Sequence, residues 1–470
     1  MHRFLKRFLK ELQFFSMALG LALPCAAQSP GASASAIEPG RPDPRIVAAL
    51  RQVSAARIQA NIEKLVSFGT RATISAQDPA SLAAGRGIGA AREWIKAEFE
   101  RYAKDCGGCL EVKTDTFTEA PAERIPQPTV ITNVYAVLKG ASDAQRMVLV
   151  TGHYDSRNSG TLDGQGDAPG ANDDGSGTAV SLECARVLSK LSSKMKFPAT
   201  IIFLTVAGEE QGLNGSRHFA KFAKEQGWNL AAVLNNDIVG GDKSAEQDHA
   251  VVRVFSEGLP AAATEQEIRR IRGLGGESDS GSRQLARYIA DVGRTYAGDV
   301  GVKPMLVFRL DRYLRGGDHY SFNQEGFSGV RFTEFREDFH HQHQDVRTEN
   351  GIEYGDVPKF VDFDYVAKVA RLNAATLASL AAGSAPPANV HLLAKDLEND
   401  STLTWDAEPG AAEYEILWRA TTSPEWEHAL KCGNVTRATL KLSKDNVIFA
   451  VRAVDAEGHA SLPVVPVAER

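Results

Sequence analysis

The 470-residue sequence has no excess of basic residues and few cysteines. Lysine and arginine number 53 against 59 aspartates and glutamates, which gives a formal net charge of -6. A chain without a polycationic surface is not expected to bind nucleic acid, so DNA and RNA are disfavoured as partners. Hydrophobic residues make up 43% of the chain and charged residues 24%, as in ordinary globular proteins. At about 150 residues per domain, the length predicts two or three domains.

The apolar run near the N-terminus is too short to cross a membrane. Residues 14–23 are about half as long as the roughly 20 residues that a span needs. Basic residues precede this run and small residues follow it, which is typical of a secretory signal. A lipoprotein signal would need a small residue before Cys25, where Pro24 stands. We therefore predict a signal peptide over residues 1–27, a secreted or periplasmic protein, and no stable membrane insertion after cleavage.

Cleavage there would leave four cysteines, of which Cys106 and Cys109 form a CxxC motif. In an oxidising compartment this motif predicts a local disulfide that closes a turn. A zinc knuckle would need a second cysteine or histidine pair nearby, and a redox motif would need a thioredoxin-like βαβ unit. Neither pattern surrounds the motif, so we expect a structural disulfide.

The pattern of apolar residues divides the rest of the chain. Residues 28–44 are rich in proline, alanine, glycine and serine, which predicts a flexible lead-in. Over residues 45–383, segments with helical periodicity alternate with short apolar runs that are typical of buried strands. This alternation predicts an α/β fold: a doubly wound, largely parallel sheet with helices on both faces.

After residue 383 the apolar residues alternate with period two, and turn residues separate the runs. This pattern predicts an all-β sandwich over residues 386–470. With Trp405, Tyr414 and Trp418, the segment resembles a fibronectin type III domain. Such domains are common accessory modules, so attachment to a surface or a polymer is a candidate role.

The glycine-rich segment GANDDGSG (170–177) places two adjacent carboxylates, Asp173 and Asp174, before a predicted helix. Aspartate is preferred at helix N-termini, so the segment taken alone favours a helix cap. Adjacent like charges also repel one another unless a cation lies beside them. The other polar residues of the chain favour such a cation.

Histidines and carboxylates stand at four ends of predicted strands. In open α/β sheets, ligands bind outside the carboxyl ends of the strands, so we expect these side chains to gather into a metal centre. They are His153 and Asp155 after residues 147–150, Glu209 and Glu210 after residues 200–206, Asp237 after residues 230–235, and His319 in the segment that leads to the strand at 329–332.

The charges of these side chains fit two zinc ions. Asp173, Glu210 and Asp237 bring three negative charges against four positive ones, while His153 and His319 ligate as neutral imidazoles. A bridging hydroxide would make the centre nearly neutral, as a partly desolvated site favours. Two ions roughly 3.5–4 Å apart need a shared carboxylate, and Asp173 in its glycine-rich turn suits that position.

Five motifs resemble those of peptidase family M28, zinc peptidases whose members include bacterial aminopeptidases on a doubly wound sheet. In family order they are GHYDS (152–156), PGANDDGSG (169–177), AGEEQGLNGS (207–216), NNDIVG (235–240) and RGGDHYSF (315–322). The resemblance implies a binuclear zinc exopeptidase that acts on peptides, and an aminopeptidase first of all.

The resemblance also implies roles for single residues. Five side chains would hold the ions: His153 and Asp237 one, Glu210 and His319 the other, and Asp173 both. Glu209 would be the general base, and Asp155 would orient His153. The peptide bond between Asp173 and Asp174 is cis in the family.

Other residues near these motifs are candidates for the pocket. The family often uses a tyrosine to stabilise the oxyanion, and Tyr313 and Tyr320 are the nearby ones. The segment FHHQHQD (339–345) contains His341 and His343. We expect these histidines to line the pocket or support it, because the predicted zinc site is complete without them.

Three alternatives stay open. A carboxypeptidase on the same fold would need a cationic pocket for the substrate carboxylate, which Arg157, Arg312 and Arg315 could form. A glutaminyl cyclase works with one zinc ion, so the presence of both His153 and Asp237 argues against it. A non-catalytic binding protein that acts through the β-sandwich would be expected to have lost a ligand or the base, and none is missing.

Overall fold

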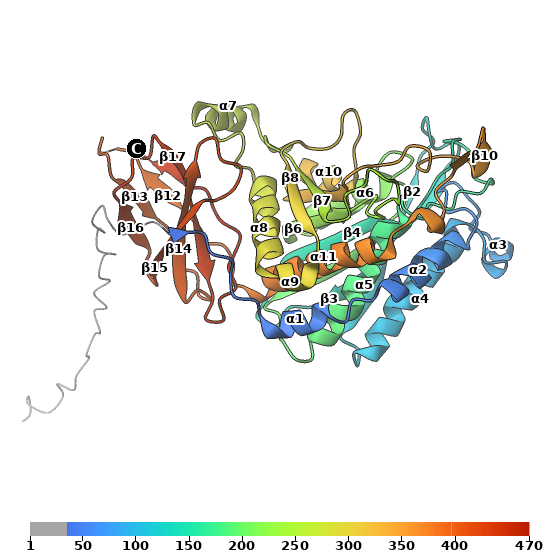
Figure 1. The fold of residues 1–470 in the computed structure, drawn as a ribbon, viewed down its shortest axis with the longest axis horizontal. Helices are drawn as coiled ribbons and strands as arrows, with labels where there is room; N and C mark the ends of the chain where they lie inside the picture. The colour runs from blue at the N-terminus through green and yellow to red at the C-terminus, as the bar shows by residue number, and fades with distance from the viewer. Residues whose placement is uncertain (1–34, 396, 470) are drawn as a thin grey trace, which may run out of the picture.

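The computed structural model describes residues 35–395 and 397–469. The predicted signal peptide and residues 28–34 of the lead-in lie outside this range. The described residues form an α/β domain, with a β domain beside it on the left of Figure 1. Within them, no helix is both long and apolar enough to cross a membrane.

An eight-stranded sheet forms the centre of the α/β domain, with the order β2-β3-β5-β4-β6-β9-β7-β8. Its strands are β2 (Leu110–Glu119), β3 (Thr129–Leu138), β4 (Asp143–His153), β5 (Ala199–Val206), β6 (Asn229–Asn236), β7 (Val251–Ser256), β8 (Lys303–Val307) and β9 (Gly329–Glu334). The central strands β5, β4, β6 and β9 are parallel, whereas the pairs β2–β3, β3–β5 and β7–β9 are antiparallel. The sheet is therefore mixed. The antiparallel pairing of β2 with β3 follows from their short connection, since parallel neighbours need a long crossover.

Helices cover both faces of this sheet, as the alternating pattern predicted. They are α1 (Pro44–Leu50), α2 (Ala55–Val66), α3 (Pro79–Ala83), α4 (Gly87–Asp105), α5 (Gly175–Leu191), α6 (Asn214–Glu225), α7 (Glu265–Gly273), α8 (Gly281–Thr295), α9 (Ala297–Val300), α10 (Asp318–Gln324) and α11 (Phe363–Ala382). In β4, Val148 and Val150 pack into the core with α2, α4, α5 and α11, while Leu149 packs into a second core with α6 and α10. Successive residues of a buried strand thus serve opposite faces.

The C-terminal β domain consists of two four-stranded sheets with the orders β1-β15-β14-β17 and β16-β13-β12-β18. Its strands are β12 (His391–Leu393), β13 (Ser401–Thr404), β14 (Glu413–Ala420), β15 (His428–Gly433), β16 (Arg437–Leu440), β17 (Val447–Val454) and β18 (Val467–Glu469). Side chains of both sheets, among them Trp405, Tyr414 and Trp418, form one hydrophobic cluster. The two sheets therefore share a core.

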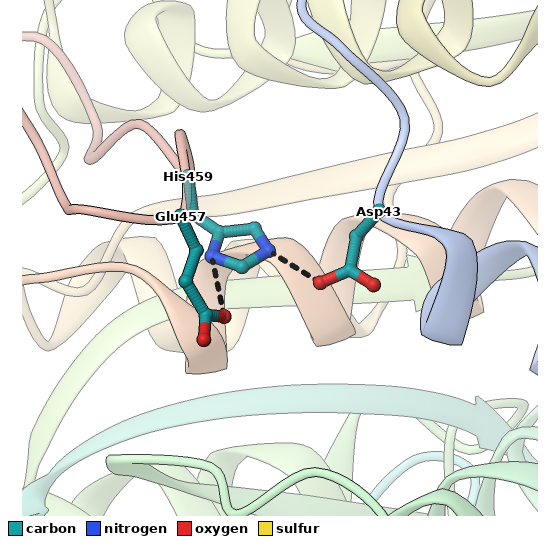
Figure 2. Close-up of side chains that lie close together, drawn as sticks. All are labelled: Asp43, Glu457 and His459. Atoms are coloured by element: carbon teal, nitrogen blue, oxygen red, sulfur yellow. Dashed lines mark hydrogen bonds and ion pairs between the residues drawn. The ribbon is translucent and has the colours of Figure 1, made fainter.

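Residues 35–44, which the composition predicted as part of a flexible lead-in, make specific contacts with both domains. Strand β1 (Ser35–Ala36) pairs antiparallel with β15 of the β domain. Asp43 then caps α1 of the α/β domain, and its carboxylate lies 3.1 Å from Nε2 of His459, which follows β17 (Figure 2). This short segment ties the two domains together.

Smaller elements complete the description. A two-stranded ribbon, β10 (Arg347–Glu349) and β11 (Ile352–Tyr354), and the 3₁₀ turn η1 (Pro358–Phe360) lie between β9 and α11. Cys106 and Cys109 form a disulfide directly after α4, as the CxxC motif predicted.

Candidate metal centre

The predicted metal ligands come from turns at the carboxyl edge of the central sheet. Strands β4, β5, β6 and β9 are parallel, so they end at the same edge. His153 is the last residue of β4, Glu210 follows β5, and Asp237 follows β6. Asp173 lies in the turn before α5, and its carboxylate meets these side chains at the same edge.

Two groups of potential ligand atoms share Asp173. In the first donor group, Nε2 of His153 lies 3.1 Å from Oδ1 of Asp173 and 3.9 Å from Oδ1 of Asp237. In the second donor group, Nε2 of His343 lies 2.9 Å from Oδ2 of Asp173 and 3.0 Å from Oε1 of Glu210. Tetrahedral zinc with bonds of about 2.0–2.1 Å places its ligand atoms roughly 3.3 Å apart. Three of these four distances lie close to that value, and the ligand atoms of each group all lie within 4.8 Å of one another.

His319 belongs to neither group, and this corrects the predicted ligand set. It is buried in the first turn of α10, where its Nε2 lies 2.9 Å from the carbonyl oxygen of Leu310. His343, expected in the pocket wall, supplies the imidazole of the second group. It follows β9 and so lies beyond the carboxyl end of that strand, whereas His319 precedes β9.

The chemistry of the donor set fits a metal cation. Imidazole nitrogens and carboxylate oxygens are zinc ligands. Nε2 of His153 is buried and makes no hydrogen bond, an arrangement that a buried polar nitrogen seldom keeps unless something else binds it. Asp173, Glu210 and Asp237 are all nearly inaccessible to solvent, and so many buried carboxylates need positive charge beside them.

The pKa values report the same excess of negative charge. Burial would lower the pKa of His153, but Asp155 and Asp173 raise it well above its usual value. Burial would also lower the pKa of His343, yet Glu210 and Asp173 raise it to about 10. The carboxylates of each donor group thus favour positive charge at its imidazole, and a bound cation would satisfy the same demand.

Asp155 contacts both neighbouring parts of the site. Its Oδ1 lies 3.3 Å from Nδ1 of His153, on the side of the ring opposite the donor group. Its Oδ2 accepts hydrogen bonds from the Thr73 hydroxyl at 2.8 Å and from the backbone N–H of Glu210 at 3.2 Å. Asp155 therefore holds both His153 and the turn that carries Glu210, which is what an orienting residue does.

The two adjacent aspartates divide the two roles that the sequence left open. Asp174 caps α5 through the N–H of Gly177 at 2.8 Å, and it also accepts the N–H of His153 at 2.9 Å. Asp173 instead faces the donor groups, and the peptide bond between the two residues is cis. The segment is a helix cap and a candidate metal turn at once.

Two residues that position Asp173, namely Asp356 and Gln342, were not predicted from the sequence. The carboxylate of Asp356 accepts the backbone N–H groups of Asn172 and Asp173, both at 2.7 Å. Gln342 donates from Nε2 to Oδ2 of Asp173 at 2.8 Å. Both come from the long segment after β9, so only the folded chain brings them to this turn.

Glu209 lies beside the donor groups and belongs to neither of them. It is partly exposed, while Glu210 is buried. Burial raises the pKa of Glu209 well above its usual value against the opposing effect of His153, and the carboxylates of Asp237 and Glu210 add to the rise. A carboxylate of this kind is suited to accept a proton from water and release it again.

The other candidate pocket residues are Tyr313, Tyr320 and His341, of which His341 lines a small pocket together with Asp173. The Tyr313 side chain is 77% exposed, and its hydroxyl accepts a hydrogen bond from Arg309 at 2.8 Å. Tyr320 is half-buried in α10. His341 lies 2.5 Å from Asp242 through Nδ1 and stacks on Phe360. Asp242 and Phe360 thus hold the ring of His341 in place.

Comparison with known proteins places the site in a family. The profile of Peptidase family M28 matches residues 133–357. A protein of Pyrenophora teres named "Probable zinc metalloprotease" is 45% identical over 94% of this chain and 90% of its own length. One of the same name from Pyricularia oryzae is 47% identical over 90% of this chain and 85% of its own length.

Solved structures share the fold. LapA of Legionella pneumophila matches with a TM-score of 0.50 and 22% identity over 73% of this chain and 78% of LapA. LapB of the same organism also gives 0.50, with 20% identity over 74% of this chain and 78% of LapB. With its sequence relatives, the site defines a zinc-dependent hydrolase. The chain belongs to peptidase family M28.

Proposed function

We propose that the protein is an exported exopeptidase with two zinc ions, which removes N-terminal residues from peptides. The proposal of two ions rests on the position of Asp173, because one oxygen of its carboxylate lies in each donor group. The first ion would be held by His153, Asp173 and Asp237, and the second by Asp173, Glu210 and His343. Bound there, zinc would supply Lewis-acid activation of the scissile carbonyl and of a water molecule.

The residues of the chain supply the proton transfers. Glu209 accepts the proton of the attacking water and returns it to the leaving amine, and its raised pKa favours both steps. Asp155 keeps His153 in orientation during this cycle. Asp356 and Gln342 keep the shared carboxylate of Asp173 in position.

The contacts of Arg157, Arg312 and Arg315 favour an aminopeptidase over a carboxypeptidase. Arg312 and Arg315 both bind Glu337, at 2.7 and 3.1 Å, and so are not free to form a pocket for a substrate carboxylate. Arg157 contacts the second donor group. LapA, whose fold this chain shares, is named an aminopeptidase.

We assign the β domain to the fibronectin type III type, because its two sheets enclose Trp405, Tyr414 and Trp418. Its contacts with the lead-in favour a role in stabilising the α/β domain over attachment to a surface or a polymer. Removal of the domain would test this by its effect on thermal unfolding.

Metal analysis and a substrate panel test the proposal. The purified protein should contain close to two zinc ions per chain. It should hydrolyse peptides with a free N-terminus and leave N-blocked peptides intact, including those with a free C-terminal carboxylate. Hydrolysis of blocked peptides alone would identify a carboxypeptidase, and cyclisation of N-terminal glutamine without hydrolysis would identify a cyclase.

A further inference from the structure

Arg157 lies directly against the second donor group. Its Nη2 lies 2.9 Å from Nδ1 of His343, and its Nε lies 3.4 Å from Oε2 of Glu210. The side chain is only 17% exposed, so water screens its charge poorly. Arg157 thus touches the two residues that belong to the second group alone.

The histidine of the first donor group, His153, has a negatively charged neighbour in place of a positively charged one. Nδ1 of His153 faces the carboxylate of Asp155 at 3.3 Å. A histidine that ligates a metal through one nitrogen normally donates its other N–H to a carboxylate, a carbonyl or water, which makes it a better ligand. A guanidinium has five donors and no acceptor, so Arg157 cannot receive an N–H from His343.

This contact opposes a cation at the second group in two ways. A neutral imidazole that binds zinc through Nε2 carries its proton on Nδ1, where it would face a donor of Arg157. The guanidinium also carries a fixed positive charge, which repels a divalent ion bound to the other side of the same two ligands. Zinc can fill the group only if Arg157 moves away or the contact is strained.

An arginine near a metal ligand does not by itself have this effect. Arg331 contacts Oδ2 of Asp237 in the first group at 2.8 Å, but Asp311 lies 3.4 Å from the same guanidinium nitrogen and balances its charge. Asp237 also keeps its other oxygen for the donor group. Among the described residues, the only ion-pair partner of Arg157 is the ligand Glu210 itself.

We propose that Arg157 weakens zinc binding at the second donor group, so that the two zinc ions bind in order, the first group before the second. The inference rests on the proposed two-zinc centre. It makes Arg157 a positioning residue that sets how readily the second ion enters and leaves.

Zinc titration of the metal-free protein against a competing chelator tests this order. The variants are Arg157→Gln and Arg157→Met, which remove the charge, and Arg157→Lys, which keeps it. Arg86→Gln is the matched control, because Arg86 binds Asp167 and touches no ligand. Cobalt absorption spectra of each equivalent, compared with that of His343→Ala, which keeps the imidazole of the first group only, would show which group is filled first.

Wild type and Arg86→Gln should bind the second zinc at least tenfold more weakly than the first. Each neutral variant should tighten the second zinc by tenfold or more and change the first less than twofold, and Arg157→Lys should stay close to wild type. An unchanged or weakened second zinc in a folded neutral variant would overturn the inference. A wild-type protein that never takes up a second zinc, while both neutral variants also bind one, would instead overturn the two-zinc proposal and the inference with it.

Discussion

Two of the histidine–carboxylate clusters among the described residues differ in their surroundings: one lies at the edge of the central sheet and one at the junction of the domains. The junction cluster contains Asp43, Glu457 and His459, drawn in Figure 2, together with Asp455. By spacing alone, both clusters could hold a metal ion. Their remaining contacts separate them.

In the junction cluster every position that a cation would take is already used. Arg45 binds both Asp43 and Glu457, so a guanidinium stands between the two carboxylates. His459 uses Nδ1 for Asp455 at 3.0 Å and Nε2 for Asp43 at 3.1 Å. At the first donor group of the metal centre, by contrast, Nε2 of His153 makes no hydrogen bond, whereas His343 of the second group has contacts at both ring nitrogens, as His459 does. The balance of charge, more than the residue types, decides which cluster suits a metal.

The largest expected effect is the loss of activity at the metal centre when Glu209 is replaced. We expect Glu209→Gln to lower kcat by about 10²–10⁴-fold, because the amide cannot accept a proton. Zinc content should stay at the wild-type value, because Glu209 is in neither donor group. Glu210→Gln is the matched variant and should lose zinc as well as activity. Substantial turnover by Glu209→Gln would contradict its role as general base.

The two candidate histidines are distinguished by zinc content. We expect His343→Ala to lose the second zinc ion and most activity, because the second donor group keeps only carboxylates. His319→Ala should keep both ions and lower the free energy of unfolding by about 1–3 kcal/mol through its lost hydrogen bond. Metal analysis with chemical denaturation separates these outcomes. Loss of zinc from His319→Ala alone would restore the ligand set predicted from sequence.

The junction histidine should affect stability alone. We expect His459→Ala to lower the free energy of unfolding by about 1–3 kcal/mol, since it leaves the buried Asp43 with one partner fewer. Zinc content and turnover should not change. His391→Ala is the matched control. His391 is half-buried in the same domain, and its Nδ1 lies 3.9 Å from Oε2 of Glu469, which is too far for a hydrogen bond. A parallel loss of zinc from His459→Ala would mean that the junction also binds metal.

The smallest expected effect is the pH dependence of that junction. Burial would lower the pKa of His459, but Asp455 and Asp43 raise it. The stabilisation from its charged form is therefore complete below the ordinary pKa of about 6.5 and is lost as pH rises through the raised value. The difference in unfolding free energy between wild type and His459→Ala should accordingly shrink above neutral pH.

Acid should weaken the same junction through Asp43. Burial would raise the pKa of Asp43, but Arg45 lowers it to about 2, so its contribution is complete above about 3.8 and falls toward pH 2. Denaturation of wild type and His459→Ala between pH 4 and pH 9 measures the histidine part. A difference that grows with pH would contradict the assigned contacts.

The strand-end rule found most of the candidate site before the fold was known. His153, Glu210 and Asp237 follow apolar runs that form parallel strands, and parallel strands end at one edge. For β9 we applied the rule to His319, which precedes that strand, and assigned His343, which follows it, to the pocket wall. The prediction did not require the ligand to come after the strand, where the carboxyl end lies, and so it accepted a histidine before β9.

The sequence by itself determined the alternating elements, the carboxylate-rich turn at Asp173 and the family, because these depend on residue types at short spacing. Only the tertiary structure decided that His343 faces Asp173, that Arg157 lies behind it, and that residues 35–44 join the two domains. Each of these contacts joins segments far apart in the chain. Their partners follow from how long connections pack, and no local pattern encodes that.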